Sequence, residues 1–389
     1  MNKSGFIARC KAFLKRNRFV YRIYYYMMSL FVNLLKLFLK TDNKLILFVS
    51  FGGRKCTDSP RAIYDWMLSD ERYKDYKMVW GVINPTEFPE LKNKVRIDSL
   101  TYFKIALKAR CWVTNVLVER ALGFKGINTF YLYTGHGSPI KKDGPDYKNP
   151  NRFIKLGRFH YNASLAQSDL ERDVRSRAFK IPYSEVYMIG TPTNDILSSY
   201  SMDYRNEIRN ELGIPKSKKA ILYAPTFREY NSIGTFETAT VDFEKWHNYL
   251  GEDYVILYRA HPISLSKQKE KKEWFIDATN YNSIEPLMIA SDILVSDYSG
   301  LIPDYSIMHK PIYLWTYDYE QYEKVRGLYF DIRKVLPFAD KEEDLLQLIK
   351  EGFTDEQQDE VLKFQQDYAP IYGSATKAAV DIIWNKINE

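Results

Sequence analysis

The chain has 389 residues, of which 45% are apolar and 27% charged, enough for two ordinary domains with large cores. This composition excludes a disordered chain, because so much apolar surface can offset the entropy lost on folding. Glycine shows no repeating period, and three cysteines (Cys10, Cys56 and Cys111) cannot build a disulfide framework. The collagen-like and disulfide-rich classes are therefore excluded, and a reducing compartment is the simplest expectation.

The net charge of +7 belongs to one end of the chain. Residues 1–41 contain nine Lys and Arg and no acidic residue, so the remainder holds 47 basic against 49 acidic residues. A nearly neutral body argues against a nucleic-acid-binding protein, which would carry its own basic face.

Residues 5–40 intersperse cations among apolar and aromatic side chains. The longest weakly polar run, Ile23 to Leu35, is about 13 residues long and contains Ser29 and Asn33, whereas a membrane span needs about 20 residues. We therefore predict that residues 1–42 form a basic amphipathic helix on an anionic membrane surface. A helix packed on the body or on a partner, and a true membrane span, are the alternatives.

From residue 44 onward, short apolar runs alternate with helix-like stretches. Seven expected strands lie between residues 44 and 190, and five lie between 220 and 317. The stretches 341–351, 355–366 and 375–386 are expected to be terminal helices. Strands that alternate with helices indicate βαβ units and parallel sheets. A polar, turn-rich stretch at 191–203 predicts the boundary between two doubly wound domains that face each other across a cleft.

Ligands of open parallel sheets bind outside the carboxyl ends of the strands, so the residues that follow each strand are informative. The strand at 129–135 ends in Gly-His-Gly-Ser-Pro, where His136 can act as a general base beside Gly137 and Ser138. Thr226 and Arg228 follow the strand at 220–226, and Arg228 could clamp a phosphate. The structural alternatives are a histidine in a turn and an arginine in a surface ion pair.

Two further clusters follow strands of the second set. Arg259 and His261 alternate at a strand end, so both point to one face and suit an anion. The stretch VSDYSG forms a tight turn into a helix whose backbone N–H groups could bind an anion, and Asp304 lies one turn further on. The residues of this last cluster are Ser296, Asp297, Ser299, Gly300 and Asp304. Ordinary helix capping is the structural alternative.

Together these clusters predict a nucleotide-dependent transferase, with diphosphate ligands on the second domain and a histidine on the first. The glycine motifs of dinucleotide oxidoreductases and P-loop NTPases do not occur. His160, His247 and His309 are scattered, and no metal-binding DxD motif stands at a strand end.

The chain resembles the CDP-glycerol glycerophosphotransferase family, the teichoic acid primases and polymerases of Gram-positive bacteria. The resemblance rests on HGSP (136–139), YAPTFR (223–228), RAHP (259–262), SDYSG (296–300) with Asp304, and the stretch 311–331. Residues 51–67 and 190–195 also resemble family segments. Three positions depart from the family pattern: Phe227 stands for Trp, Gly300 for Ser and Thr193 for Arg.

The resemblance implies a GT-B-like α/β fold of two Rossmann-like domains. Combined with the boundary and the N-terminal helix inferred above, it predicts residues 1–42 as the membrane helix, 43–195 as the acceptor domain and 196–389 as the CDP-polyol-binding domain. It also implies attachment to the cytoplasmic face of the membrane. The expected reaction is transfer of a polyol phosphate, glycerol phosphate first, from a CDP-polyol to a hydroxyl of a polyprenyl-diphosphate-linked saccharide, with release of CMP.

Within this reaction, His136 is the expected base. His261 is the second expected catalytic residue and, with Arg259, Ser299 and Gly300, would hold the diphosphate. Asp304 would orient His261 or bind polyol hydroxyls. The other expected substrate-binding residues are Gly137, Ser138, Thr226, Arg228, Ser296 and Asp297.

No resident cofactor is expected, and the sequence leaves open whether a divalent metal is needed. The alternatives are a CDP-ribitol phosphotransferase, a GT-B glycosyltransferase or epimerase that uses a sugar nucleotide, and a non-catalytic module that binds an anionic polymer.

Overall fold

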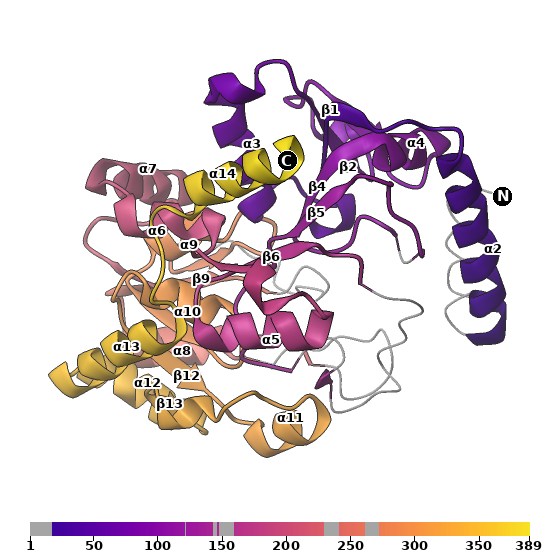
Figure 1. Cartoon of the computed structure of the whole chain (residues 1–389). Coiled ribbons are helices and arrows are strands. Elements are labelled where there is room, and N and C mark those ends of the chain that lie inside the picture. The colour runs from indigo at the N-terminus through magenta and orange to yellow at the C-terminus, as the bar shows by residue number, and fades with distance from the viewer. Residues whose placement is uncertain (1–17, 121, 143–145, 148–158, 229–240, 261–271) are drawn as a thin grey trace, which may run out of the picture.

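The protein contains two parallel sheets with helices packed on their faces (Figure 1). The computed structural model describes residues 18–120, 122–142, 146–147, 159–228, 241–260 and 272–389. The first sheet has the order β3-β2-β1-β4-β5-β6-β7 and the second has the order β10-β9-β8-β11-β12-β13. The strands of the first sheet are β1 (Asp42–Val49), β2 (Lys77–Val82), β3 (Lys94–Arg96), β4 (Ala109–Thr114), β5 (Phe130–Tyr133), β6 (Ala163–Ala166) and β7 (Val186–Met188). Those of the second are β8 (Lys219–Tyr223), β9 (Tyr254–Tyr258), β10 (Phe275–Asp277), β11 (Ile293–Ser296), β12 (Ile312–Trp315) and β13 (Phe338–Ala339).

All twelve predicted strands are present, because each contains a short apolar run, and the central strands are buried on both faces. The thirteenth, β13, was not predicted, since two residues give no periodic signal. The α-helices are α2 (Arg18–Lys36), α3 (Asp58–Ser69), α4 (Leu100–Lys108), α5 (Asp169–Phe179), α6 (Asp195–Ser199), α7 (Met202–Leu212), α8 (Phe243–Leu250), α9 (Glu285–Ala290), α10 (Leu301–Ser306), α11 (Tyr319–Val325), α12 (Glu342–Glu351), α13 (Asp355–Tyr368) and α14 (Ala375–Asn388).

The last helix departs from the predicted division of the chain. Residues 196–389 were expected to form the second domain, but α14 lies beside α3 on the first sheet (Figure 1). Its apolar residues Val380 and Ile383 are buried in the same core cluster as Ile63 of α3. The Asp195 carboxylate accepts hydrogen bonds from the first two amides of α14, at 2.9 and 2.8 Å. A negative charge at a helix N-terminus is favourable, so Asp195 fixes the point where the chain returns.

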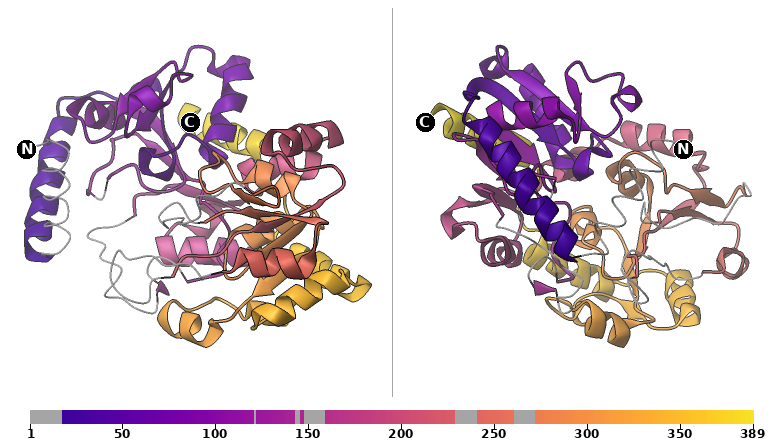
Figure 2. Two further views of the ribbon diagram at one scale, coloured as in Figure 1. Left: turned by 180° about the vertical axis from the view of Figure 1, so that it is seen from behind. Right: turned by 90° about the vertical axis from the view of Figure 1, so that its right-hand side faces the viewer.

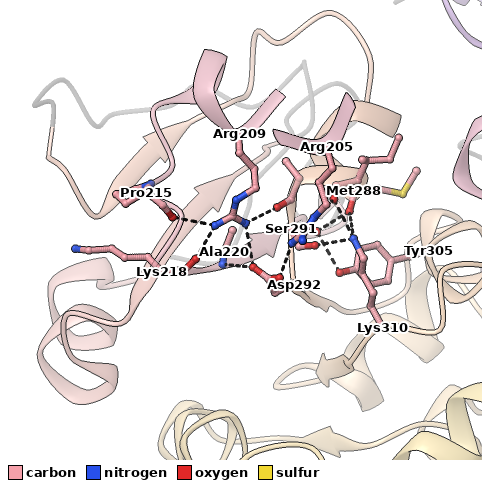
Figure 3. Close-up of polar contacts among 12 residues, drawn as sticks. Arg205, Arg209, Pro215, Lys218, Ala220, Met288, Ser291, Asp292, Tyr305 and Lys310 are labelled. Atoms are coloured by element: carbon pink, nitrogen blue, oxygen red, sulfur yellow. Dashed lines mark hydrogen bonds and ion pairs between the residues drawn. The ribbon is translucent and has the colours of Figure 1, made fainter. Parts of the chain in front are cut away.

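A buried polar cluster fastens α7 to α9 in the second domain (Figure 3). Arg205 and Arg209 of α7 form ion pairs with Asp292, at 2.5 and 3.1 Å. Lys310 Nζ donates to the carbonyls of Met288, Ile289 and Ser291 at the end of α9. Burial lowers the pKa of Lys310 to about 7. These donors form hydrogen bonds with the carbonyls that a helix C-terminus leaves without partners. They thereby fix the position of α9, whose first residue, Glu285, accepts a hydrogen bond from Thr193 of the segment between the two sheets.

The helix α2 lies on the outside of the first domain (Figure 2). Asn33 Nδ2 donates to the carbonyls of Ser29 and Gly123, both at 2.8 Å, and the Gly123 amide donates to Ser29 Oγ at 2.8 Å. Val32 is fully buried beside them. The two polar residues that interrupt the apolar run are therefore the docking contacts of the helix. Across the described residues, no helix combines the length and apolar character that crossing a membrane requires.

The two domains meet along a seam that follows the predicted HGSP turn. Lys141 and Leu328 form an antiparallel bridge, and the Lys142 amide donates to the Gly327 carbonyl at 2.9 Å. The Tyr329 amide donates to the Ile140 carbonyl, also at 2.9 Å. Backbone pairing thus joins the segment after His136 to the second domain.

Candidate active site

His136 stands just beyond the carboxyl end of β5 and is exposed. Its ring Nδ1 lies 2.8 Å from the main-chain oxygen of Asn115, which follows β4. A carbonyl can only accept, so Nδ1 carries the proton and Nε2 presents its lone pair. This tautomer is the one that a general base requires.

Asn115 is itself held by the segment that follows β1. Its Oδ1 accepts from the Phe51 amide and its Nδ2 donates to Asp58, both at 2.8 Å. The Phe51 ring lies edge-on to His136, with 6.0 Å between ring centroids. Burial raises the pKa of the Asp58 carboxyl, and the neighbouring His136 opposes this rise. The segments that follow β1, β4 and β5 therefore together fix the orientation of the His136 imidazole.

The turn after His136 contacts the start of α10 in the second domain, backbone to backbone. The Ser138 amide donates to the Gly300 carbonyl at 3.1 Å. Gly137 has a φ of 88°, and a Cβ atom on it would lie 3.3 Å from the Gly300 carbonyl group. A Cβ atom on Gly300 would lie only 2.6 Å from the Ser138 carbonyl oxygen. The absence of side chains at these two positions lets the histidine loop reach the predicted anion site.

A buried hydrogen-bond network continues this contact behind the loop. Gln167 Nε2 donates to Ser138 Oγ at 2.6 Å and to Asp304 Oδ1 at 2.7 Å. Asn194 Nδ2 also donates to Asp304 Oδ1, at 2.7 Å. Burial raises the pKa of Asp304 to about 7, although both hydrogen bonds oppose the rise. Asp304 of the second domain is thus linked to Gln167 of the first domain and to Asn194 of the connecting segment. Its predicted partner His261 lies outside the described residues.

The predicted pair Thr226 and Arg228 lies in a buried cluster with Asp297. The Thr226 amide donates to the Asp297 carboxylate at 2.9 Å, while the Thr226 hydroxyl, also buried, has no hydrogen-bond partner among the described residues. The Arg228 guanidinium pairs with Asp297 at 2.8 Å and with Asp318 at 2.5 Å, and is 2% exposed. It therefore holds two loops of the protein together, and the predicted contact with a phosphate would require these ion pairs to break.

The other predicted residues divide into structural and accessible ones. Ser296 is fully buried, and its hydroxyl donates to the Ala224 carbonyl at 2.8 Å, which is a structural contact. Ser299 is half-buried at the start of α10, where its Oγ faces the Leu301 amide. Arg259 is half-buried at the end of β9 and donates to the carbonyls of Ala278 and Tyr281. Burial lowers the pKa of Arg259.

Several residues of this site were not singled out from the sequence. Asn115 and Gln167 directly follow β4 and β6, but the predicted strands 111–116 and 163–167 included them, so the rule that pointed to His136 was not applied to them. Lys55, Asp58 and Asn194 lie in segments that carried the family resemblance without an assigned role. No three His, Cys, Asp or Glu side chains within the described ranges are grouped so that they could hold a metal ion.

Comparison with known proteins gives a consistent result. The model of the family described as CDP-Glycerol:Poly(glycerophosphate) glycerophosphotransferase matches residues 31–385. A teichoic acid glycerol-phosphate transferase of Staphylococcus aureus is 31% identical over 78% of this chain and 82% of its own length. A teichoic acid poly(glycerol phosphate) polymerase of Staphylococcus epidermidis is 34% identical over 77% of this chain. This chain spans only 44% of that polymerase's length.

The solved structures agree. The wall teichoic acid polymerase TagF superimposes with a TM-score of 0.76, at 28% identity over 90% of both chains. Another TagF structure, obtained after a soak with CDPG, also has a TM-score of 0.76. This likeness confirms the predicted GT-B-like fold of two parallel-sheet domains. The chain belongs to the CDP-glycerol:poly(glycerophosphate) glycerophosphotransferase family.

Proposed function

We propose that this protein transfers a polyol phosphate from a CDP-polyol to a hydroxyl group of an acceptor and releases CMP. The observation that carries the proposal is the orientation of His136, whose Nδ1 is tied to the Asn115 carbonyl while its turn rests on the start of α10. A base from one domain is thereby set beside the expected anion site of the other. The names of the relatives, which include glycerol-phosphate and ribitol-phosphate polymerases, support this reaction class.

In the proposed reaction, the acceptor oxygen forms a bond to the β-phosphorus of the CDP-polyol. The bond from that phosphorus to the bridging oxygen breaks, CMP leaves, and the proton of the acceptor hydroxyl passes to His136 Nε2. Phosphoryl transfer depends chiefly on positioning and charge stabilisation. Arg259, His261 and the backbone at Ser299 and Gly300 are proposed to hold the diphosphate, and no resident cofactor is part of the proposal.

Glycerol phosphate is the proposed group, because glycerol-phosphate enzymes are prominent among the relatives that cover most of this chain. Ribitol-phosphate polymerases match at lower identity, 27%. The proposed acceptor is a lipid-linked saccharide of teichoic acid or a related cell-surface polymer, in keeping with the teichoic acid enzymes among these relatives.

The deciding experiment measures CMP release by the full chain supplied with CDP-glycerol or CDP-ribitol and a short-chain prenyl-diphosphate disaccharide. We expect acceptor-dependent CMP from one donor, and a loss of about 10²–10⁴-fold in His136→Ala. Turnover in that variant near the wild-type rate would remove His136 from the base role. Release of UDP or GDP from sugar nucleotides, with no CMP from either donor, would support the glycosyltransferase alternative instead.

We propose also that α2 binds an anionic membrane surface. Away from the side of α2 that contacts Gly123, a long stripe of apolar side chains is exposed. Its members in the helix are Phe19, Ile23, Tyr26, Met27, Leu30, Phe31 and Leu34, and exposed Leu37 and Phe38 directly follow the helix. Exposed Arg22 lies in the same helix, and cations beside an apolar face suit anionic lipid headgroups.

Sedimentation with phosphatidylglycerol vesicles tests this surface. We expect the double variant Leu30→Asp, Leu34→Asp to stay in the supernatant while the wild type pellets. The matched control Leu68→Asp places the same charge on an exposed residue of α3 and should pellet like the wild type. Equal sedimentation of the double variant and the wild type would contradict the proposal.

A further inference from the structure

Two cations from different domains meet at one backbone oxygen. Lys55 lies between β1 and α3 in the first domain, and its Nζ donates to the Asn282 carbonyl at 2.9 Å and to the Tyr281 carbonyl at 3.5 Å. Arg259, at the end of β9 in the second domain, donates to the same Tyr281 carbonyl at 2.5 Å. Two positive charges are therefore held within hydrogen-bond distance of a single neutral acceptor.

Nothing in the described part of the chain neutralises this pair directly. Among the described residues, the side-chain nitrogens of Lys55 and Arg259 donate to main-chain carbonyls, and Glu285 is the carboxylate whose charge acts on both cations. Burial lowers the pKa of Lys55, and the charge of Arg259 lowers it further. A site that keeps two cations half-buried and repelling each other favours an anion that contacts both.

The nearby acidic group does not take that place. Glu285 attracts both cations at longer range. Its side chain is 6% exposed and accepts hydrogen bonds from Thr193, at 2.7 Å, and from Ser283. Burial raises the pKa of Glu285, and the charge of Asp58 adds to the rise. The carboxylate of Glu285 thus accepts hydrogen bonds from neutral donors, and it takes up a proton more readily than a free carboxylate.

The loop that carries Lys55 contains several backbone positions with positive φ. Phe51, Gly52 and Gly53 have φ values of 45°, 63° and 82°, and Asp58 has a φ of 67°. Such left-handed positions persist only where the surrounding structure enforces them, and they cluster at ligand sites. The same loop supplies the Phe51 and Asp58 contacts to Asn115, which orients His136.

We propose that Lys55 and Arg259 together bind the diphosphate of the CDP-polyol, so that the first domain contributes a cation of its own to the donor site. The proposal rests on the proposed function and extends it by one substrate-contacting residue. A diphosphate that contacts Lys55 and Arg259 would link the two domains close to His136. Donor binding and the position of the proposed base would therefore depend on each other.

The test is titration calorimetry of the full chain with CDP and with cytidine. Lys55→Met removes a charge-assisted hydrogen bond to the diphosphate and should weaken CDP binding by about 10- to 100-fold. Binding of cytidine, which has no phosphate, should be unchanged. Lys55→Arg keeps the charge and should recover most of the affinity for CDP. The matched control is Lys44→Met, which removes a lysine near the opposite end of β1 whose Nζ pairs with Asp75 on the surface; it should bind CDP like the wild type.

Four results would overturn the inference. These are unchanged CDP affinity in Lys55→Met, an equal loss for cytidine, an equal loss in Lys44→Met, and no recovery in Lys55→Arg. An equal loss for cytidine, together with a lower melting temperature, would show that Lys55 only fastens the domains. A wild-type chain that neither binds CDP nor releases CMP would instead refute the proposed function itself, so the two failures are distinguishable.

Discussion

The amide of Ser138 donates a hydrogen bond to the carbonyl of Gly300 across the seam between the two domains, at 3.1 Å. The contact joins the turn that carries His136 to the first residue before α10. It is possible only because position 300 has no side chain, since a Cβ atom there would lie 2.6 Å from the Ser138 carbonyl oxygen. The glycine at position 300 therefore sets how closely the two loops approach.

Gly300→Ala should lower turnover more than it lowers donor binding. The added methyl group must push the Ser138 backbone away, and a displacement of about 1 Å can cost about 10²-fold in rate. We expect at least about a 10-fold fall in the rate of CMP release, with a smaller fall in CDP affinity, because the Gly300 backbone is itself proposed to hold the diphosphate. Both are measured on the same preparation, by CMP release and by calorimetry.

The control for this variant is Gly213→Ala. Gly213 has a φ of 76° at the end of α7, but a Cβ atom on it would meet no atom within 4 Å. It should lower the melting temperature through backbone strain and leave turnover intact. If both variants turned over at the wild-type rate, the close approach at Gly300 would have no part in positioning His136.

Much of the fold could be predicted because its signals are local. Each sheet strand is an apolar run bounded by turns, and His136, Arg259 and Ser299 were identified because parallel strands present ligands at their carboxyl ends. The return of α14 to the first domain could not be predicted, since it depends on a tertiary contact between Asp195 and amides 180 residues further on. Amphipathic periodicity shows that a helix has a buried face but not which core receives it.

The roles of the predicted site residues were harder to predict than their positions. Arg228 lies beyond the end of β8 and Ser296 is the last residue of β11, where ligand-binding residues are expected, yet both interact with groups of the protein itself. Their partners Asp318 and Ala224 lie on other segments, so no spacing in the sequence reveals the pairing. Lys55 was missed for the same reason, because its significance comes from the nearness of Arg259 in the other domain.

Arg228→Met should destabilise the second domain. It removes the cation that pairs with the buried carboxylates of Asp297 and Asp318, and breaking such a pair costs about 3–5 kcal/mol. Urea unfolding followed by circular dichroism measures the loss. Adding Asp318→Asn to this variant should restore part of the stability, because one unpaired charge is removed. Wild-type stability with a selective loss of CDP binding would instead assign Arg228 to the phosphate.

Asp304 should make the stability of the fold fall as the pH rises from about 4 to about 7. Its pKa is raised from 3.8 to about 7, so the folded state favours the protonated carboxyl. That contribution is complete below the unfolded pKa and is lost as the pH passes through the folded pKa. Melting temperatures of the wild type and Asp304→Asn at pH 5, 6, 7 and 8 give the difference directly, since other groups cancel. The melting temperature of the variant should rise relative to that of the wild type between pH 5 and about pH 7 and level off towards pH 8, because above the folded pKa both states have lost the proton. Parallel curves from pH 5 to pH 7 would contradict the assignment.

The docking of α2 on the body should depend on Asn33. Its side chain donates to the Ser29 and Gly123 carbonyls, and a lost hydrogen bond costs about 1 kcal/mol. Asn33→Ala should therefore speed hydrogen exchange in α2 while CMP release from soluble substrates stays at the wild-type rate, because the hydrogen bonds that Asn33 makes with described residues go to Ser29 and Gly123 and not to a candidate site residue. Leu30→Ala changes the exposed face of the same helix and should leave exchange unchanged. Equal exchange in the two variants would mean that apolar contacts such as those of Val32, rather than the polar pair, hold the helix.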